Sequence, residues 1–474
     1  MVDKRVAYVE KPLYSSCTVN ETKHKPPSSW MGRLGQYIRL IPESIRSFAS
    51  ISNLKAHLSN PLYINGYYLM GNFLATAVSG FAFWIIAANF YSDTDVGIAS
   101  AMISAMSLLS LFSTLGLGFG LIRFLPGAGD KSTKMINSCF TISALVSVVV
   151  AAIYVAGLPI WSPKLGELRE HPIWAASFVA FTAVYAISST VDTVFIAERT
   201  AKSTFVKSVV NAILKLPLPI AFASLFGAFG IFASAGLAIT AAMGLALFWL
   251  LPRSQRGYVP LPAWHRSVVG EMLRYSLGTY LANLLWLAPQ YLFPLLVVNI
   301  LGGDVNAHFY IAWSIAYIPF LIPIAMSYSL FAEGSHDESG LRRDIRRALV
   351  ASLLIVITVM ALIFALGDKV LLLFGREYSE TATSLLWVLS LSAIPLTINY
   401  IFLALYRVRK NITVLLIASA GATCLSLGFS YVLMRELGLI GVGLGWTLGQ
   451  SIVAAIVVVP LLRQSRSLPE ATNR

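Results

Sequence analysis

Residues 348–367, ALVASLLIVITVMALIFALG, form an uninterrupted apolar stretch that contains no charged side chain. About 20 apolar residues in a helix are enough to cross the hydrocarbon core of a membrane. Four arginines, Arg342, Arg343, Arg346 and Arg347, stand directly before it. An apolar run with basic residues at one end is typical of a membrane-spanning helix whose basic end faces the cytoplasm.

Eleven further segments of the same kind occur along the chain, so the sequence predicts an all-α polytopic membrane protein. The bulk composition agrees, because 57% hydrophobic residues, 12% charged residues and a mean hydropathy of +0.73 do not suit a soluble protein of 474 residues. The twelve predicted spans lie near 62–90, 96–122, 136–160, 173–196, 204–225, 229–251, 275–300, 307–331, 348–367, 382–405, 412–433 and 439–462.

The basic residues alternate with these spans. With the N-terminus inside, 29 of the 35 Lys and Arg residues fall on the inner side and 5 on the outer side, and Lys215 lies within a span. The distribution predicts that both termini are cytoplasmic and that the chain lies in the plasma or inner membrane. It also accounts for the net charge of +13, which favours membrane lipids with anionic headgroups. We expect no nucleic-acid partner, because no basic cluster lies in a soluble domain.

The chain repeats itself. Tyr68-x-x-Gly71-x-x-Leu74-Ala75 opens the first span, and the same pattern opens the seventh span at Tyr275, 207 residues later. Each half begins on the cytoplasmic side, so we expect two six-helix bundles related as a parallel internal repeat, which is a transporter layout. The predicted bundles cover residues 61–252 and 275–463, joined by a cytoplasmic linker over 253–274.

The segments outside the bundles are short. Residues 1–60 form a cytoplasmic tail, in which apolar residues recur at helical spacing over 30–50. This pattern fits an interfacial helix on the inner leaflet, or a loosely ordered lead-in to the first span. Residues 464–474 form a second cytoplasmic tail. No predicted connection is long enough to hold a catalytic domain.

The motifs of several enzyme classes are missing from the sequence. No Walker P-loop, HExxH, GxSxG or paired-carboxylate motif occurs. The three cysteines, Cys17, Cys139 and Cys424, have neither disulfide nor metal-ligand spacing. We therefore expect no enzyme activity, no catalytic residue, no cofactor and no metal.

Residues 89–126, NFYSDTDVGIASAMISAMSLLSLFSTLGLGFGLIRFLP, contain an outer Tyr-Ser-x-x-Asp-Val-Gly turn, a Ser/Leu-rich helix, Leu-Gly-Leu-Gly, and a final Arg-Phe-Leu-Pro. This region resembles the polysaccharide (oligosaccharide) flippase branch of the multidrug/oligosaccharidyl-lipid/polysaccharide exporter superfamily. The resemblance covers roughly residues 60–463. It implies a V-shaped pair of bundles that moves polyprenyl-diphosphate-linked oligosaccharides from the inner to the outer leaflet by alternating access, in cell-surface polysaccharide biosynthesis. It also implies a cavity lined mainly by spans 1, 2, 7 and 8, and allows for contacts with other polysaccharide-assembly proteins.

A diphosphate-linked sugar needs a hydrated path with cationic and polar side chains. Arg123 ends span 2 and Arg274 begins span 7 near Glu271, so both could bind diphosphate, or could simply anchor a helix end at the headgroups. Five polar residues within spans 1 and 7 could contact sugar, or could bond a neighbouring helix instead. They are Asn72, Asn283, Trp286, Gln290 and Tyr291.

Span 5 carries a polar stripe. Thr204, Ser208, Asn211 and Lys215 follow helical spacing, and Pro217 and Pro219 should kink or break the helix after them. Lys215 lies deep in the span without a carboxylate of matching depth, so it could bind diphosphate, act as a coupling group, or serve only packing.

A second charged position in the same region has an evident partner. Asp192 on span 4 and Lys207 on span 5 lie at similar predicted depths of roughly 8–9 Å, at 1.5 Å per residue. We predict that they form a structural ion pair.

Three other functions fit the sequence less well than a flippase does. A cation-coupled multidrug antiporter of the same superfamily commonly uses an acidic residue in span 1, but residues 62–90 contain no Asp or Glu. A glycosyltransferase, polymerase or ligase needs a longer outer loop. A major-facilitator carrier needs a basic signature between spans 2 and 3, where this chain has Leu125-Pro126-Gly127-Ala128-Gly129.

Overall fold

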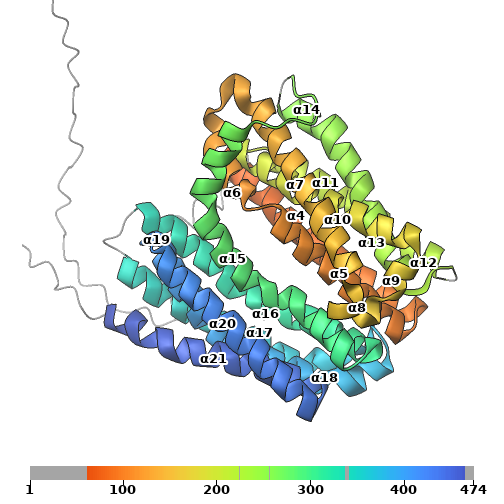
Figure 1. The fold of residues 1–474 in the computed structure, drawn as a ribbon. Coiled ribbons are helices and arrows are strands. Elements are labelled where there is room, and N and C mark those ends of the chain that lie inside the picture. The colour runs from red at the N-terminus through yellow and green to blue at the C-terminus, as the bar shows by residue number, and fades with distance from the viewer. Residues whose placement is uncertain (1–60, 224, 256, 337–340, 465–474) are drawn as a thin grey trace, which may run out of the picture. The chain divides into compact units, whose positions relative to one another are not determined.

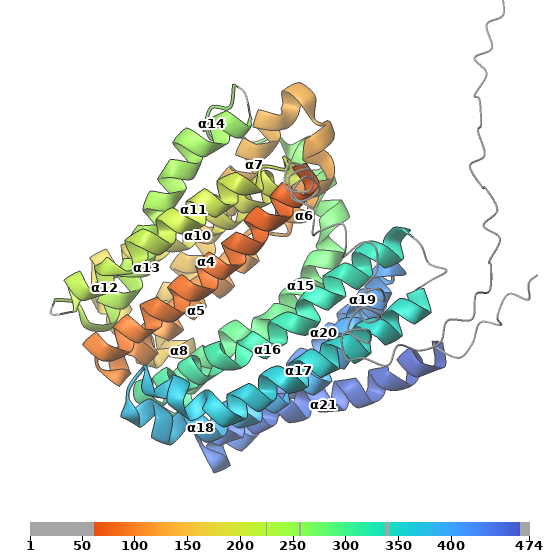
Figure 2. The same cartoon turned by 180° about the vertical axis from the view of Figure 1, so that it is seen from behind.

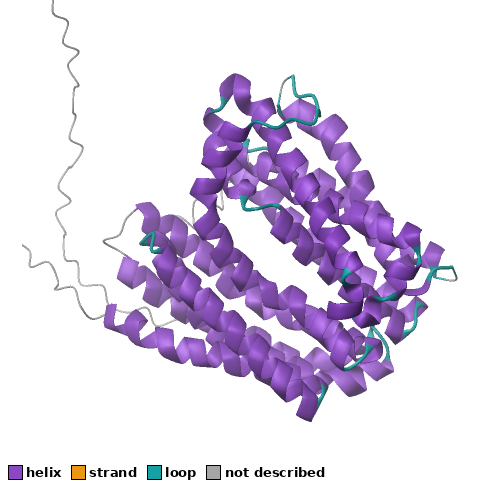
Figure 3. Cartoon of the chain, in the orientation of Figure 1, coloured by secondary structure: helices purple, strands orange, loops and turns teal. Residues whose placement is uncertain are grey.

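The computed structural model describes residues 61–223, 225–255, 257–336 and 341–464. These residues form helices joined by short loops, and no strand occurs among them (Figure 3). The expected interfacial helix at 30–50, and the C-terminal tail from residue 465, lie outside the described residues. The described residues from 65 to 464 make up one compact unit.

Twelve helical segments of the described chain are long and apolar enough to span a membrane, which confirms the predicted number. Those of the first half are built from α4 (Pro61–Phe90), α5 (Asp93–Ser113), α7 (Ser132–Ala156), α10 (Pro172–Ala197), α11 (Ala201–Lys215) with α12 (Pro217–Phe222), and α13 (Gly227–Leu245) with a π-helical turn at Ala246–Leu250 and α14 (Leu251–Ser254). Those of the second half are α15 (Arg266–Ile300), α16 (Gly303–His336), α17 (Leu341–Leu372), α18 (Arg376–Leu391) with α19 (Ala393–Val408), α20 (Ile412–Leu437) and α21 (Leu439–Gln464). The short helix α6 (Leu117–Phe124) follows α5 after a break in the predicted second span, and the short helices α8 (Leu158–Trp161) and α9 (Glu167–Glu170) lie in the connections.

Two of the spans are broken at positions that the sequence explains. α11 ends at Lys215 and α12 begins at Pro217, as expected from two prolines that cannot donate a backbone hydrogen bond. The second span breaks after α5, where Leu115 and Gly116 adopt left-handed φ values of 49° and 73°. A β-carbon on Gly116 would overlap the side chain of Tyr280 on α15, so glycine also allows this close packing.

The helices form two bundles, α4–α14 and α16–α21, and α15 leads from the first to the second (Figures 1 and 2). The internal repeat is visible in the packing. A β-carbon on Gly71 of α4 would lie 3.1 Å from Phe205 of α11, and one on Gly278 of α15 would lie 2.9 Å from Ile412 of α20. Phe205 and Ile412 are separated by the same 207 residues as the two glycines, so spans 1 and 5 pack as spans 7 and 11 do.

Candidate functional site

The two bundles are joined tightly at the end where α4 turns into α5. A β-carbon on Gly97 would overlap the carbonyl oxygen of Gly303, so two backbones are in contact there. Asn306 of α16 donates from Nδ2 to the Gly97 oxygen at 2.7 Å and to Ser100 Oγ at 3.0 Å. Asn89 of α4 donates to the backbone oxygen of Leu373 at 3.2 Å. We call this region the closed end.

The turn between α4 and α5 is tied to its own bundle as well. The Tyr91 hydroxyl donates to the backbone oxygen of Pro219 at 2.6 Å. Burial, and to a lesser extent the charge of Asp95, raises the pKa of Tyr91 to about 12, so the phenol is a hydrogen-bond donor at neutral pH. Asp95 in turn accepts from the backbone N–H of Ala228 at 2.9 Å. These contacts tie the turn to α12 and α13 of its own bundle.

A pocket of about 660 Å³ lies between the bundles next to the closed end. Its lining comes from α4, α5, α15 and α16, with Phe374 from the turn before α18. These are spans 1, 2, 7 and 8, the four that the family resemblance implied. The aromatic residues that line it are Phe81, Trp84, Tyr291, Tyr310, Trp313, Tyr317 and Phe374, and the polar ones include Thr76, Ser104, Ser107, Gln290 and Ser314.

The exposure of the lining residues shows where the pocket opens. Near the closed end, Trp84 and Ile311 are 6% and 0% exposed. Farther along the same helices, Val78 and Ile318 are 60% and 50% exposed. The pocket is therefore sealed at the closed end and opens toward the opposite end of the bundles.

The chemistry of the pocket is aromatic and polar. Trp84 packs on Tyr310 with ring centroids 4.7 Å apart, which joins α4 to α16 at the pocket wall. None of the described residues that line the pocket carries a charge. Aromatic faces, hydroxyls and an amide suit the apolar faces and hydroxyl groups of sugar rings.

The structure separates the five residues that were predicted to contact sugar. Gln290 and Tyr291 line the pocket. Trp286 instead packs on Tyr400 of α19, with ring centroids 5.0 Å apart. Asn72 and Asn283 are partly buried and are not among the lining residues, and the Asn72 Oδ1 atom is buried without a hydrogen-bond partner.

Arg123 and Arg274 lie on neighbouring helices at the open end. Each is exposed, and the residues that follow them, Phe124 and Tyr275, pack with ring centroids 5.6 Å apart. Neither arginine lines the pocket, and neither forms an ion pair with a described residue. The structure thus brings the two helices together without placing either guanidinium in the pocket.

Asp192 and Lys207 lie in direct contact, as an ion pair between α10 and α11. Lys207 donates from Nζ to Asp192 Oδ2 at 2.7 Å, to Ser188 Oγ at 2.8 Å and to the Ser188 backbone oxygen at 3.0 Å. The Lys207 side chain is 6% exposed and that of Asp192 is 33% exposed. All of these contacts lie inside the first bundle.

Lys215 has an aromatic partner. Its Nζ lies 4.0 Å from the centroid of the Phe83 ring, and Phe83 is fully buried on α4. Lys215 is not among the residues that line the pocket. No ion pair joins it to a carboxylate of the described chain, in line with the expectation that it lacks one.

Sequence reasoning missed most of the pocket. In the sequence, Trp84, Tyr310, Trp313 and Tyr317 resemble ordinary apolar residues of their spans. The available signal is a tryptophan or tyrosine within spans 1 and 8, of the same kind as Trp286 and Tyr291 in span 7. No spacing along the chain indicates the cluster of Asp93, His308 and Glu377 at the closed end, which could hold a metal ion.

Comparisons with known proteins agree with this fold. An inward-facing multidrug resistance MATE family transporter of the MOP superfamily superimposes with a TM-score of 0.65 at 17% identity, covering 84% of this chain and 96% of that one. An outward-facing structure of a multidrug resistance MATE family transporter of the MOP superfamily superimposes with a TM-score of 0.60 at 19% identity, covering 86% of this chain and 95% of that one. The lipid II flippase MurJ, in an inward closed conformation, superimposes with a TM-score of 0.67 at 12% identity, covering 84% of this chain and 87% of that one. At these identities the likeness shows the fold alone.

The family follows from the sequence match. None of the curated proteins compared with this chain matches it. The family model described as "Polysaccharide biosynthesis protein" matches residues 63–331, more than half of the chain. With its twelve membrane-spanning segments and the fold of the MOP superfamily, this multi-pass membrane protein belongs to the polysaccharide biosynthesis protein family.

Proposed function

We propose that the protein is a flippase that carries a polyprenyl-diphosphate-linked oligosaccharide from the inner to the outer leaflet. The observation that carries the proposal is the pocket between the bundles, whose uncharged lining offers aromatic faces and hydroxyl groups. Such a lining suits sugar rings, and the chain belongs to a polysaccharide biosynthesis family. The same observation disfavours a cation-coupled multidrug antiporter, because no carboxylate among the described lining residues would balance a cationic drug.

The distribution of basic residues indicates to which side of the membrane the pocket opens. The closed end holds the turns that follow spans 1, 7 and 9, and the basic residues assign these turns to the outer face. The pocket then opens to the cytoplasm, so the substrate can enter it from the inner leaflet. Transport requires a second state in which the closed end parts and the cytoplasmic end closes, with the predicted bundles 61–252 and 275–463 as the moving halves.

The diphosphate is assigned to Arg123 and Arg274. Along α15, Arg274 precedes the pocket residue Gln290 by about 24 Å, at 1.5 Å per residue. Sugar in the pocket would therefore leave the diphosphate near the inner headgroups, where exposed arginines can grip its oxygens bidentately. Lys215, which packs on Phe83 outside the pocket lining, is a third candidate, and Lys215→Met tests it.

The proposal can be tested in liposomes with a defined polyprenyl-diphosphate oligosaccharide. The purified protein is reconstituted, and a membrane-impermeant glycosidase is added outside. Without flipping, only the outward-facing part of the substrate, about half, is cleaved. We expect nearly complete cleavage with the wild-type protein and a slower second phase with Trp313→Leu. Trp387→Leu is the matched control, because Trp387 stacks on Phe364 and does not line the pocket.

Two results would contradict the proposal. In the first, cleavage stops at about half with a protein that is folded and correctly inserted. In the second, the same liposomes export a cationic dye when a proton or sodium gradient is applied. That second result would establish the antiporter instead.

A further inference from the structure

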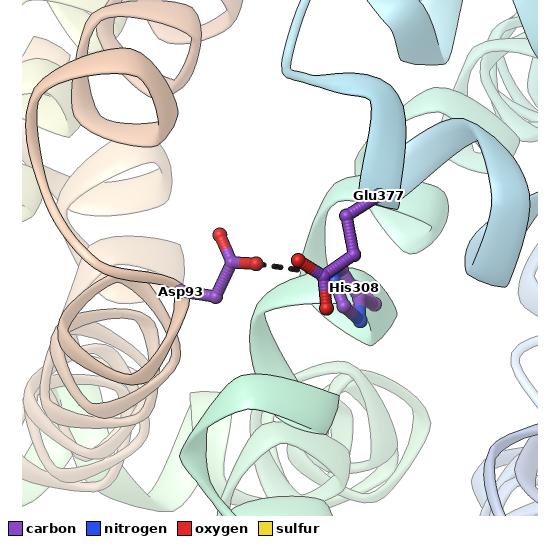
Figure 4. Close-up of side chains that lie close together, drawn as sticks. All are labelled: Asp93, His308 and Glu377. Atoms are coloured by element: carbon purple, nitrogen blue, oxygen red, sulfur yellow. Dashed lines mark ion pairs between the residues drawn. The ribbon is translucent and has the colours of Figure 1, made fainter.

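We propose that Asp93, His308 and Glu377 form a binding site for a transition-metal dication of the Zn²⁺ type, which links the two bundles across the closed end. The three side chains come from three helices. Asp93 begins α5, His308 lies in the second turn of α16, and Glu377 lies in the first turn of α18. Figure 4 shows Asp93 on one side and the other two residues facing it.

The distances fit such an ion. Each residue offers one ligand atom, and these atoms lie within 4.8 Å of one another. A tetrahedral ion with bonds of roughly 2.0–2.2 Å holds its ligands roughly 3.4 Å apart. His308 Nε2 and Asp93 Oδ2 already lie 3.4 Å apart. Glu377 is exposed, so its flexible side chain can move to complete the set.

The imidazole gives independent evidence for a missing ligand. His308 is 5% exposed, and its Nε2 atom is buried without a hydrogen-bond partner in the described chain. Asp93 is near, but the contact lacks hydrogen-bond geometry. Buried polar atoms usually have a hydrogen-bond partner, so this nitrogen is available for one. A metal ion between Nε2 and the two carboxylates would be that partner.

Among the neighbouring polar groups, the Tyr378 hydroxyl lies beside the Asp93 carboxylate. Asp95, the next acid on α5, is fully used, because it accepts from the backbone of Ala228 and from the hydroxyl of Ser92. The ring of Tyr378 packs edge-on against the His308 imidazole, with centroids 4.7 Å apart, and so limits its rotation. The site therefore has one oriented nitrogen and two carboxylates that form no other ion pair among the described residues.

The ligand set selects the ion. An imidazole nitrogen with two carboxylates suits Zn²⁺ and related dications, whereas Mg²⁺ and Ca²⁺ prefer sites made of oxygen alone. Three protein ligands leave a fourth position for water. Because Glu377 is exposed, the ion can enter from the solvent at the closed end.

The site has a consequence for movement. Asp93 belongs to the first bundle, and His308 and Glu377 belong to the second. Any movement that opens this end must pull Asp93 away from the other two. A bound ion therefore stabilises the closed end and slows opening. The effect on transport rests on the proposed function, whereas binding of the ion does not.

The test uses the full-length protein in detergent, with its affinity tag removed and its metal stripped by a chelator. Zn²⁺ is titrated by calorimetry, and thermal unfolding is followed with and without Zn²⁺. We expect one Zn²⁺ site per chain and a higher unfolding temperature with Zn²⁺, but no such rise with Mg²⁺. Asp93→Asn, His308→Gln and Glu377→Gln should each weaken binding by about tenfold or more.

Two variants keep the test decisive. Glu377→Gln changes an exposed side chain and should fold normally, so its loss of Zn²⁺ binding cannot be ascribed to misfolding. Glu380→Gln is the matched control on the same helix, because Glu380 pairs with Arg376 and should leave Zn²⁺ binding unchanged. Zn²⁺ binding that survives all three ligand substitutions would overturn the proposal. A wild-type protein that binds no Zn²⁺ would overturn it as well.

Discussion

Gly97 of α5 packs so closely on Gly303 of α16 that a β-carbon on Gly97 would overlap the Gly303 carbonyl oxygen. Asn306 of α16 adds a hydrogen bond at this contact, because its Nδ2 donates to the Gly97 oxygen at 2.7 Å. Backbone contact of this kind cannot be relieved by rotating a side chain. The closed end thus depends on a residue without a side chain at position 97.

Gly97→Ala should therefore open the closed end. Overpacking at a tight contact costs about 1–3 kcal/mol, which is enough to shift an equilibrium between two states several-fold. A cysteine that replaces the buried Ser100 reports the change in a background without Cys17, Cys139 and Cys424. We expect a membrane-impermeant maleimide to label this cysteine faster in Gly97→Ala. Gly244→Ala is the control, because a β-carbon there would meet nothing within 4 Å. Equal labelling of the two variants would show that the Gly97–Gly303 contact does not keep the closed end shut.

The orientation of the protein is tested by single cysteines at exposed positions. Lys164 and Arg435 lie on the face assigned to the outside, and Gly129 and Lys410 lie on the face assigned to the cytoplasm. In intact cells an impermeant maleimide should label the first pair, and it should label the second pair only after permeabilisation. The reverse pattern would show that the pocket opens to the outside and would contradict the proposed direction of transport.

The ion pair of Asp192 and Lys207 should stabilise the first bundle. Lys207→Met leaves the Asp192 carboxylate without its cation, at a cost of about 3 kcal/mol, the lower end of the range for buried pairs because Asp192 is 33% exposed. Asp192→Asn should cost less, since Lys207 keeps its two bonds to Ser188. The double variant should unfold at a higher temperature than Lys207→Met in detergent. If the double variant is no more stable than Lys207→Met, the ion pair does not contribute to the stability of the fold.

The features that could be predicted from the sequence are those that depend on one helix or on a repeat. A span needs only a run of about 20 apolar residues, and its direction follows from the basic residues beside it. The repeat of Gly71 and Gly278 was visible because each glycine permits the same close packing, on Phe205 in one half and on Ile412 in the other. Local patterns therefore predicted the twelve spans and the two halves.

The features that could not be predicted depend on how the bundles dock. Asp93, His308 and Glu377 are scattered over three helices, and no spacing along the chain relates them. Trp84 and Trp313 resemble any apolar residue of a span until the pocket between the bundles shows that both face it. The Lys215–Phe83 contact was missed because it joins two helices that are far apart in the sequence.

Arg123 and Arg274 can be tested by substitutions that keep the charge. Lysine cannot form the two parallel hydrogen bonds of a guanidinium to a phosphate, so Arg123→Lys and Arg274→Lys should each slow flipping by about tenfold. Because both arginines are exposed, the unfolding temperature should stay unchanged. The glycosidase assay in liposomes measures the rate. Arg347→Lys, an exposed arginine at the start of α17, serves as the control. Full flipping by the Arg123→Ala and Arg274→Ala variants would remove these residues from the diphosphate site.

Gln290 and Asn283 lie on the same helix and are both amides, so together they test how far the sugar site extends along α15. Gln290 lines the pocket and Asn283 does not. Loss of one neutral hydrogen bond costs about 0.5–1.5 kcal/mol, so Gln290→Ala should reduce flipping at low substrate concentration roughly twofold to tenfold. Asn283→Ala should have a smaller effect at equal protein abundance. If the two variants are equally impaired, the substrate contacts continue from the pocket toward the open end, and the sugar occupies the inner half of α15 as well. If Gln290→Ala flips normally while Asn283→Ala does not, the pocket beside the closed end is not where the sugar binds.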